Sequence, residues 1–180
     1  MVAAAVTIYT DVIDEALRQV LSAAEDLAPV FKNIGEYQVG STKQRFKDEK
    51  DPDGERWKDL HPLYKQTKKG PRILTGRTRS LSQIVYQMAD SQSVAIGSNL
   101  IYARIHQEGG EIRAKAGGAL VFSMGRAPGG RNSGEQVFKL KKVTIPRRSF
   151  LGINAADQER IEEIVRDHFE EALARAGVSQ

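Results

Sequence analysis

The feature that most constrains this chain of 180 residues is a helical periodicity near each end. In residues 11–28, apolar side chains recur at three- and four-residue spacing, which predicts an amphipathic helix with one buried face. Pro29 lacks a backbone donor and should bend or break this helix before a second helical stretch at about 30–47. Residues 155–176 repeat the pattern with a strongly acidic outer face and end at Gly177, which suits a left-handed helix terminus. We therefore expect two long helical regions to pack on whatever lies between them.

The middle of the chain predicts short strands and turns. The predicted strands cover residues 83–89, 93–97, 112–115, 119–124 and 137–145. Short helical segments are expected at 77–82 and 100–107, and an exposed polar loop at 65–70. Together these elements predict an α+β fold: a small antiparallel or mixed β-sheet packed by a long N-terminal helical region and a C-terminal helix. The length fits a single domain spanning 1–180.

Residues 125–134 contain four glycines and a proline, a composition that forms no regular element. They predict a flexible, extended Gly-rich β-hairpin loop that carries Arg126 and Arg131. In an oligomeric ring such a loop could reach a neighbouring subunit or the lumen and become ordered on contact.

Charge divides the sequence into blocks. Residues 1–40 and 151–180 each carry a net charge of −4, whereas 41–79 and 80–150 each carry +6. The basic middle favours a surface that faces DNA or an acidic partner, because clustered Lys and Arg attract anions. The alternative is that these side chains simply solvate exposed strands and loops. A basic patch speeds association with anionic partners, but it does not identify which partner binds.

No group of residues in the sequence is typical of a catalytic, cofactor or metal site. The chain has no cysteine, which excludes disulfides and Cys-based metal or redox sites. His168 and Glu171 have a spacing that could hold a metal, but an ordinary exposed helix pair is favoured. No nucleophile elbow or phosphate-binding loop is present. We expect no enzyme activity, no cofactor and no metal.

Neither a secretion signal nor a membrane span is expected. The apolar start has no Lys or Arg before it and is followed by Asp11, Asp14 and Glu15, the reverse of the charge order in a signal peptide. No apolar run approaches the roughly 20 residues that a bilayer-crossing helix needs. We therefore expect no membrane partner.

Several separated segments resemble the phage virion morphogenesis, or tail-completion, family of Mu-like and related contractile-tailed phages. These segments are Arg45-Phe46, residues 51–60 (DPDGERWKDL), 73–81 (ILTGRTRSL), 94–99 (VAIGSN), 102–110 (YARIHQEGG) and 145–152 (IPRRSFLG). Their order and spacing make the match specific, whereas residues 117–135 fit less well and are typical of a variable insertion.

The resemblance implies a structural protein that acts late in virion assembly, at the head–tail neck or the tail end, as a tail-completion or tail-terminator-like ring component. It implies a homo-oligomeric ring, hexameric in many relatives of this shape, that meets the tail tube or terminator and the head connector. DNA passing through the channel is a further expected contact. The expected location is the virion, with the host cytoplasm during assembly. No catalytic residues follow from the resemblance.

Two residue sets follow for the candidate site. The candidate interface or lumen residues are Arg126, Arg131, Lys139, Lys141, Arg147 and Arg148. The candidate structural motif residues are Asp53, Gly54, Trp57, Gly76, Tyr102, His106, Gly109, Gly110, Pro146 and Phe150. Gln107 and His106 are expected to hold their corner of the fold by hydrogen bonds. The alternative function is a DNA-binding accessory protein that uses the basic middle segment.

Overall fold

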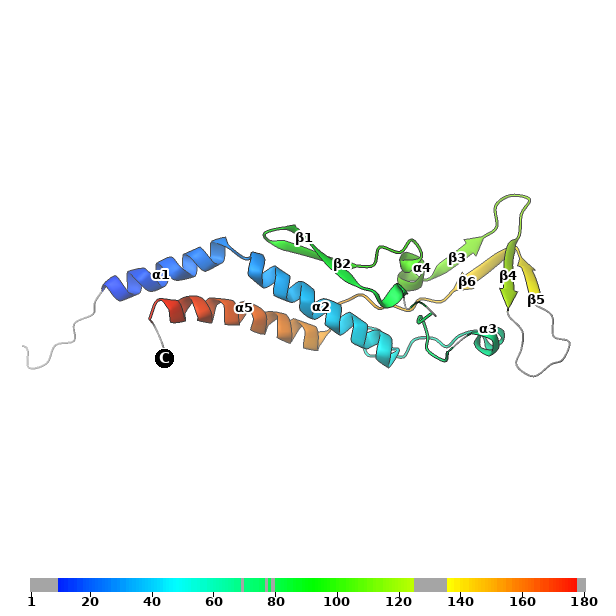
Figure 1. Cartoon of the computed structure of the whole chain (residues 1–180), viewed down its shortest axis with the longest axis horizontal. Helices are drawn as coiled ribbons and strands as arrows, with labels where there is room; N and C mark the ends of the chain where they lie inside the picture. The colour runs from blue at the N-terminus through cyan, green and yellow to red at the C-terminus, as the bar shows by residue number, and fades with distance from the viewer. Residues whose placement is uncertain (1–9, 69, 77, 79, 125–135, 178–180) are drawn as a thin grey trace, which may run out of the picture. The chain divides into compact units, whose positions relative to one another are not determined.

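The computed structural model describes residues 10–68, 70–76, 78, 80–124 and 136–177 (Figure 1). The helices in this part of the chain are α1 (Thr10–Glu25), α2 (Ala28–Asp48), α3 (Pro62–Thr67), α4 (Ala103–Glu108), α5 (Ala155–Arg175) and the 3₁₀ helix η1 (Ser80–Ser82). The strands are β1 (Val85–Asp90), β2 (Ser93–Gly97), β3 (Gly110–Arg113), β4 (Leu120–Met124), β5 (Gln136–Leu140) and β6 (Lys142–Ile145). The predicted α+β class is confirmed.

The described strands form three two-stranded sheets instead of the one small sheet expected. β1 pairs with β2, β3 with β6 and β4 with β5. The single strand predicted at 137–145 was wrong, because it is divided at Lys141 into strands of two different sheets. The carbonyl of Lys141 accepts from the amide of Ala114 at 2.9 Å, which extends the β3–β6 ladder by one residue up to this break.

The described residues cluster into two compact units. Unit 1 takes them from Met1–Gln38, Tyr86–Ala95 and Ala155–Gln180. Unit 2 takes them from Val39–Val85 and Ile96–Asn154, so the division falls within α2. A single domain over the whole chain stays a prediction.

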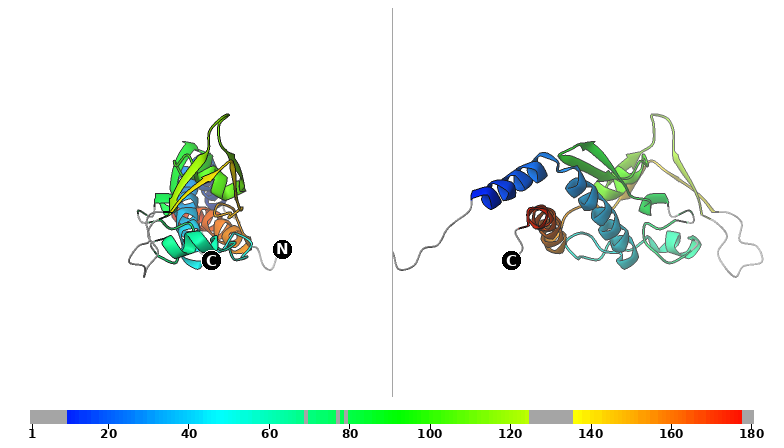
Figure 2. Two further views of the ribbon diagram at one scale, coloured as in Figure 1. Left: turned by 90° about the vertical axis from the view of Figure 1, so that its right-hand side faces the viewer. Right: turned by 60° about the vertical axis from the view of Figure 1, so that its left-hand side comes forward.

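Unit 1 is built from helices and one hairpin. Its buried centre consists of Val30 and Ile34 on α2 and Ile164 on α5. α1 packs beside α5 (Figure 1). The β1–β2 hairpin lies beside α2 (Figure 2). At Gly35 of α2, a Cβ atom would stand 2.7 Å from the ring of Tyr86 on β1. This close approach explains a glycine inside a helix that otherwise continues without interruption.

The helix boundaries follow local chemistry. α1 ends at Glu25 and α2 begins at Ala28, so the expected break occurs, but it lies at residues 26–27 and Pro29 stands in the first turn of α2. α4 ends at Glu108, and the next residue, Gly109, has a φ of +73°, as expected for a glycine after a helix end. The loop predicted at 65–70 was wrong in part, because its first residues belong to α3. Pro62 at the start of α3 fixes a helical φ without sacrificing a backbone hydrogen bond.

Unit 2 has an aromatic core. Its fully or nearly buried members are Phe46, Trp57, Ile73, Leu81, Ile84, Ala103 and Phe150. Phe150 has no exposed surface and lies in a stretch without regular secondary structure. In the described ranges no helix is long and apolar enough to cross a membrane.

Candidate functional site

The family-like segments meet around residues 147–152, an extended stretch of unit 2 that belongs to no strand. Side chains from distant segments bind its backbone in place of a neighbouring strand. The guanidinium of Arg45, on α2, donates to the carbonyl of Phe150 at 3.1 Å and to that of Gly152 at 2.8 Å. A buried backbone carbonyl needs such a partner. We call residues 147–152, together with the side chains of Arg45, Trp57 and Gln107 that bind their backbone, the junction.

Trp57 connects the junction to the core of unit 2. Its Nε1 donates to the carbonyl of Ser149 at 2.7 Å, which satisfies the only polar atom of the indole. Its ring meets Phe46 edge-on with centroids 5.3 Å apart, and Phe46 lies 5.1 Å from Phe150. Aromatic pairs of this kind contribute roughly 0.5–1.5 kcal/mol beyond simple burial. Trp57 therefore both packs and anchors the chain.

Gln107, on α4, makes three hydrogen bonds to the junction backbone. Its Oε1 accepts from the amides of Phe150 (2.9 Å) and Leu151 (3.0 Å), and its Nε2 donates to the carbonyl of Leu151 at 2.9 Å. One side-chain amide thus replaces the donors and acceptors that an adjacent strand would supply. The expectation that Gln107 holds this corner by hydrogen bonds is confirmed.

Arg148 lies inside unit 2, with only 6% of its surface exposed. Its Nε donates to the carbonyl of Lys58 at 2.7 Å and its second terminal nitrogen to that of Asp59 at 3.0 Å. Burial lowers the pKa of the guanidinium, and the nearby Asp59 carboxylate opposes that change. Arg148 was expected at an interface or lumen. The structure places it in the fold instead, because its donors are directed at these carbonyls.

Two glycines allow close backbone contacts at the junction. Gly109 has a φ of +73°, and a Cβ atom there would stand 2.7 Å from the backbone nitrogen of Arg147. A Cβ atom on Gly152 would stand 2.5 Å from the ring of Pro52. Pro52 belongs to the predicted turn, which is confirmed by the hydrogen bond from the amide of Gly54 to the carbonyl of Asp51 at 3.1 Å.

The other structural motif residues are placed as follows. Asp53 and Gly76 are exposed, and a Cβ atom on Gly76 would meet nothing within 4 Å. Tyr102 precedes α4, and its ring lies edge-on to His106 with centroids 6.2 Å apart. Gly110 begins β3, and Pro146 is half-buried between β6 and the junction.

His106 is half-buried behind the junction. Burial, and then the charge of Arg148, lower the pKa of its imidazole. Within the described residues its Nδ1 has no hydrogen-bond partner, whereas its backbone carbonyl accepts from the amide of Arg148 at 2.9 Å. A neutral ring is favoured here, and the hydrogen bond expected from this side chain is not among those seen in the described part of unit 2.

The remaining basic interface candidates lie on or near the β-hairpins of unit 2. Lys139 is exposed on β5, and Lys141 is exposed with its Nζ 3.2 Å from the carbonyl of Gly118. Arg147 is also exposed, and its Nε donates to Ser149 Oγ at 2.7 Å. Arg126 and Arg131 lie outside the described residues.

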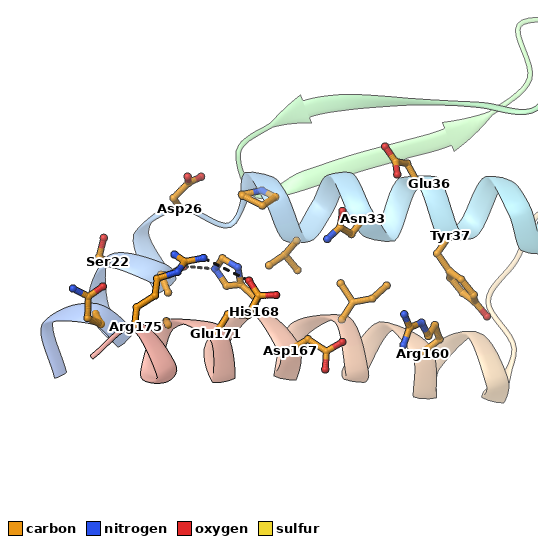
Figure 3. A pocket seen from close by; sticks show the side chains of 16 residues that line it. Ser22, Asp26, Asn33, Glu36, Tyr37, Arg160, Asp167, His168, Glu171 and Arg175 are labelled. Atoms are coloured by element: carbon orange, nitrogen blue, oxygen red, sulfur yellow. Dashed lines mark hydrogen bonds and ion pairs between the residues drawn. The ribbon is translucent and has the colours of Figure 1, made fainter. Parts of the chain in front are cut away.

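Unit 1 contains a groove of about 550 Å³ between α1, α2 and α5 (Figure 3). Its lining mixes polar, charged and apolar side chains. The titratable side chains around it are the acids Asp26, Glu36, Asp167 and Glu171 and the bases Arg160, Arg175 and His168. Arg175 pairs with Glu171 at 3.5 Å. The groove therefore presents mixed charge.

His168 serves the packing of unit 1. Its Nε2 lies 2.9 Å from the carbonyl of Ala23, which connects α5 to α1. In the described ranges no group of three or more His, Asp or Glu side chains is arranged to hold a metal ion.

Sequence reasoning missed two acids that hold distant segments together. Asp157, in the first turn of α5, is 1% exposed and accepts from the hydroxyl of Tyr37 at 3.1 Å. Glu49 accepts from the amide of Ile73 at 2.6 Å. No local signal separates these carboxylates from the other acids of the chain, because their partners come from other segments.

The two units differ sharply in charge. Unit 1 carries 5 basic and 14 acidic side chains, a balance of −9. The full residue ranges of unit 2 hold 22 basic and 9 acidic side chains, a balance of +13, of which the described residues contribute 17 basic and 8 acidic, or +9. The charge blocks seen along the sequence are thus sorted by the fold into one acidic and one basic compact unit.

Comparison with known proteins agrees with this arrangement of motifs. No curated protein and no solved structure matched the chain significantly. The model of the phage virion morphogenesis family matches residues 8–170, which include every segment that meets at the junction. The chain therefore belongs to the phage virion morphogenesis family and has a role in building the virion.

Proposed function

We propose that this protein is a ring-forming structural component of the head–tail neck or the tail end, where it completes the tail. The observation that carries the proposal is the charge division, −9 on unit 1 and +13 on unit 2, in a member of a virion morphogenesis family. Its partners in this role are further copies of itself, the tail tube or terminator and the head connector.

The charge division favours one kind of self-association. A symmetric dimer that joins unit 1 to unit 1 brings like charges together, and the same holds for unit 2. A head-to-tail contact joins the acidic unit of one copy to the basic unit of the next. Contacts of this heterologous kind generate a closed ring when the rotation between copies closes. Opposite charges also speed encounter and fix orientation more than they add affinity.

The junction supports a structural rather than a catalytic role. Its charged and polar side chains bind carbonyls and amides of the protein itself, as Arg45 and Gln107 do. Groups engaged in this way position the backbone and are not available for substrate. We accordingly assign the family-like residues to folding and the charged surfaces to assembly.

The test measures assembly in solution and in the phage. Mass photometry and sedimentation of the purified chain at low and high salt should show a closed oligomer that dissociates as salt rises. Deletion of the gene should give particles with unjoined heads and tails or tails of abnormal length. A chain that stays monomeric under all conditions, with normal particles after deletion, contradicts the proposal. Steeply salt-dependent DNA binding by such a monomer would favour the DNA-binding alternative instead.

A further inference from the structure

We propose that an apolar row on α1 of one copy packs against the β4–β5 ribbon of the next copy in the ring. The inference rests on the proposed function and names the contact surfaces that it needs. The α1 row consists of Ile13, Leu17 and Leu21. The β4–β5 ribbon consists of β4 and β5 as described above.

The α1 row is separate from the side of α1 that packs on α5. Ile13, Leu17 and Leu21 are spaced by four residues, so they lie on one face of the helix over about 12 Å. Their side chains are 49%, 62% and 61% exposed. The partly buried residues of α1, among those whose side chains are described, are Glu15, Ala16, Gln19, Val20 and Ala23, and they lie beside the row rather than in it. The apolar row thus remains uncovered after unit 1 has folded.

The β4–β5 ribbon also carries uncovered apolar side chains. Its register pairs Val121 with Lys139 and Ser123 with Val137, which places Val121, Lys139 and Val137 on the same face. Val121 is 61% exposed and Val137 is 55% exposed. A two-stranded ribbon is marginally stable in water unless a face is packed. Covering this face would stabilise the ribbon.

Two surfaces of another copy could cover the α1 row: its own α1 helix or its β4–β5 ribbon. Charge complementarity favours the ribbon. The charged side chains of α1 are Asp11, Asp14, Glu15, Arg18 and Glu25, a balance of −3. The ribbon itself carries Lys139, and the residues that adjoin it, 110–119 and 141–145, carry Glu111, Arg113, Lys115, Lys141 and Lys142, so the ribbon and its neighbours together have a balance of +4. Packing α1 on α1 would oppose acids to acids, whereas packing α1 on the ribbon pairs acids with Lys139 and its neighbours.

Cross-linking tests the contact directly, since the chain has no native cysteine. A Leu17→Cys variant and a Val137→Cys variant are mixed, allowed to assemble and treated with a short bis-thiol cross-linker. We expect a two-chain product in the mixture and little with either variant alone. A strong product from Leu17→Cys alone would show α1-to-α1 packing and overturn the inference. So would the absence of a mixed product from assembled rings.

Substitution of the α1 row gives a second test of the proposed contact. The double variant Leu17→Gln with Leu21→Gln should raise the concentration for half-assembly by about tenfold or more, with unchanged circular dichroism. Ile101→Gln is the matched control, because Ile101 is an apolar side chain of unit 2 that is 99% exposed. It should leave assembly unchanged. Rings that form normally with the double variant would overturn the α1 contact but leave the proposed function intact. Wild-type chains that never assemble would overturn both.

Discussion

The junction and the β4–β5 ribbon belong to the same unit and use their side chains in opposite ways. In the junction, charged and amide groups such as Arg45 and Gln107 are directed inward and bind backbone of the same chain. In the ribbon, apolar groups such as Val121 and Val137 are directed outward, and β4 and β5 pair only with each other among the described strands. Residues that carry the family resemblance hold the fold here, while the apolar surfaces proposed for the ring contact lie outside those segments.

The largest effect is expected from Trp57→Ala. Removing a buried aromatic side chain costs about 3–5 kcal/mol of unfolding free energy. Trp57→Phe keeps most of the packing with Phe46 and loses the bond to the carbonyl of Ser149, so it should cost only about 1–2 kcal/mol. Denaturant unfolding followed by circular dichroism measures both. Equal losses for the two variants would mean that packing matters little here.

Gln107→Leu should follow in size. The variant leaves the amides of Phe150 and Leu151 without their acceptor. Each unsatisfied buried amide should lower the free energy of unfolding by about 1–3 kcal/mol. Gln107→Glu retains an acceptor for both amides but loses the donor to the carbonyl of Leu151, so its loss should be smaller. The same unfolding assay ranks the pair. The reverse order would show that the side-chain amide does not replace a strand.

Replacing a glycine should destabilise the protein more at the junction than at an exposed position. Gly109→Ala combines a positive φ with a contact of 2.7 Å to the backbone of Arg147, and should cost about 1–3 kcal/mol. Gly76→Ala faces open space at an ordinary φ and should stay within about 0.5 kcal/mol of wild type. Thermal unfolding of the two variants gives the comparison, and similar midpoints would contradict it.

Acid should weaken unit 2 through His106. Because the pKa of its imidazole is lowered in the folded state, the unfolded chain binds the proton more tightly. The contribution of His106 to the free energy of unfolding is fully present above about pH 6.5, the pKa of histidine in the unfolded chain. It is lost as the pH falls from there toward the lower pKa of His106 in the folded chain. Unfolding curves between about pH 7 and pH 5 should show this slope for wild type and a flatter profile for His106→Gln. Parallel profiles would remove His106 as the source.

The smallest effect on folding is expected for the exposed apolar side chains. Leu17→Gln and Leu21→Gln should each change the unfolding free energy of the unassembled chain by less than about 0.5 kcal/mol, because both side chains are already in water. Chemical unfolding at a protein concentration below assembly measures this. If either variant lowered the free energy of unfolding as much as Gln107→Leu does, the α1 row would contribute to the fold as the junction does, and the two regions would not differ in role.

Much of the fold could be predicted because its signals are local. The helices at both ends, the break at Pro29, the turn at Asp51–Gly54 and the stop at Gly109 depend on periodicity, ring geometry and glycine dihedrals within a few residues. The motif order across 45–152 likewise indicated the family. What these signals could not supply was the identity of partners distant in sequence.

The errors have that common cause. Arg148 was expected on a surface, since an arginine in a turn is usually solvated, but carbonyls about 90 residues earlier in the chain bind it. The apolar positions of the segment 137–145 shift from even numbers (Phe138, Leu140) to odd numbers (Val143, Ile145) across Lys141-Lys142, so the division itself has a local signal. The two halves pair with different strands, and which strand each half pairs with depends on the segment that lies alongside.

The helices, the turns, the α+β class and the blocks of charge can be read from the amino-acid sequence. Two features come from the folded chain alone: residues 147–152 are held by side chains up to 107 positions away, and the charge blocks become one acidic and one basic unit. The physical reason is that dihedral preferences and apolar periodicity act between neighbours in the chain. Hydrogen-bond satisfaction and surface charge depend on which distant segments meet.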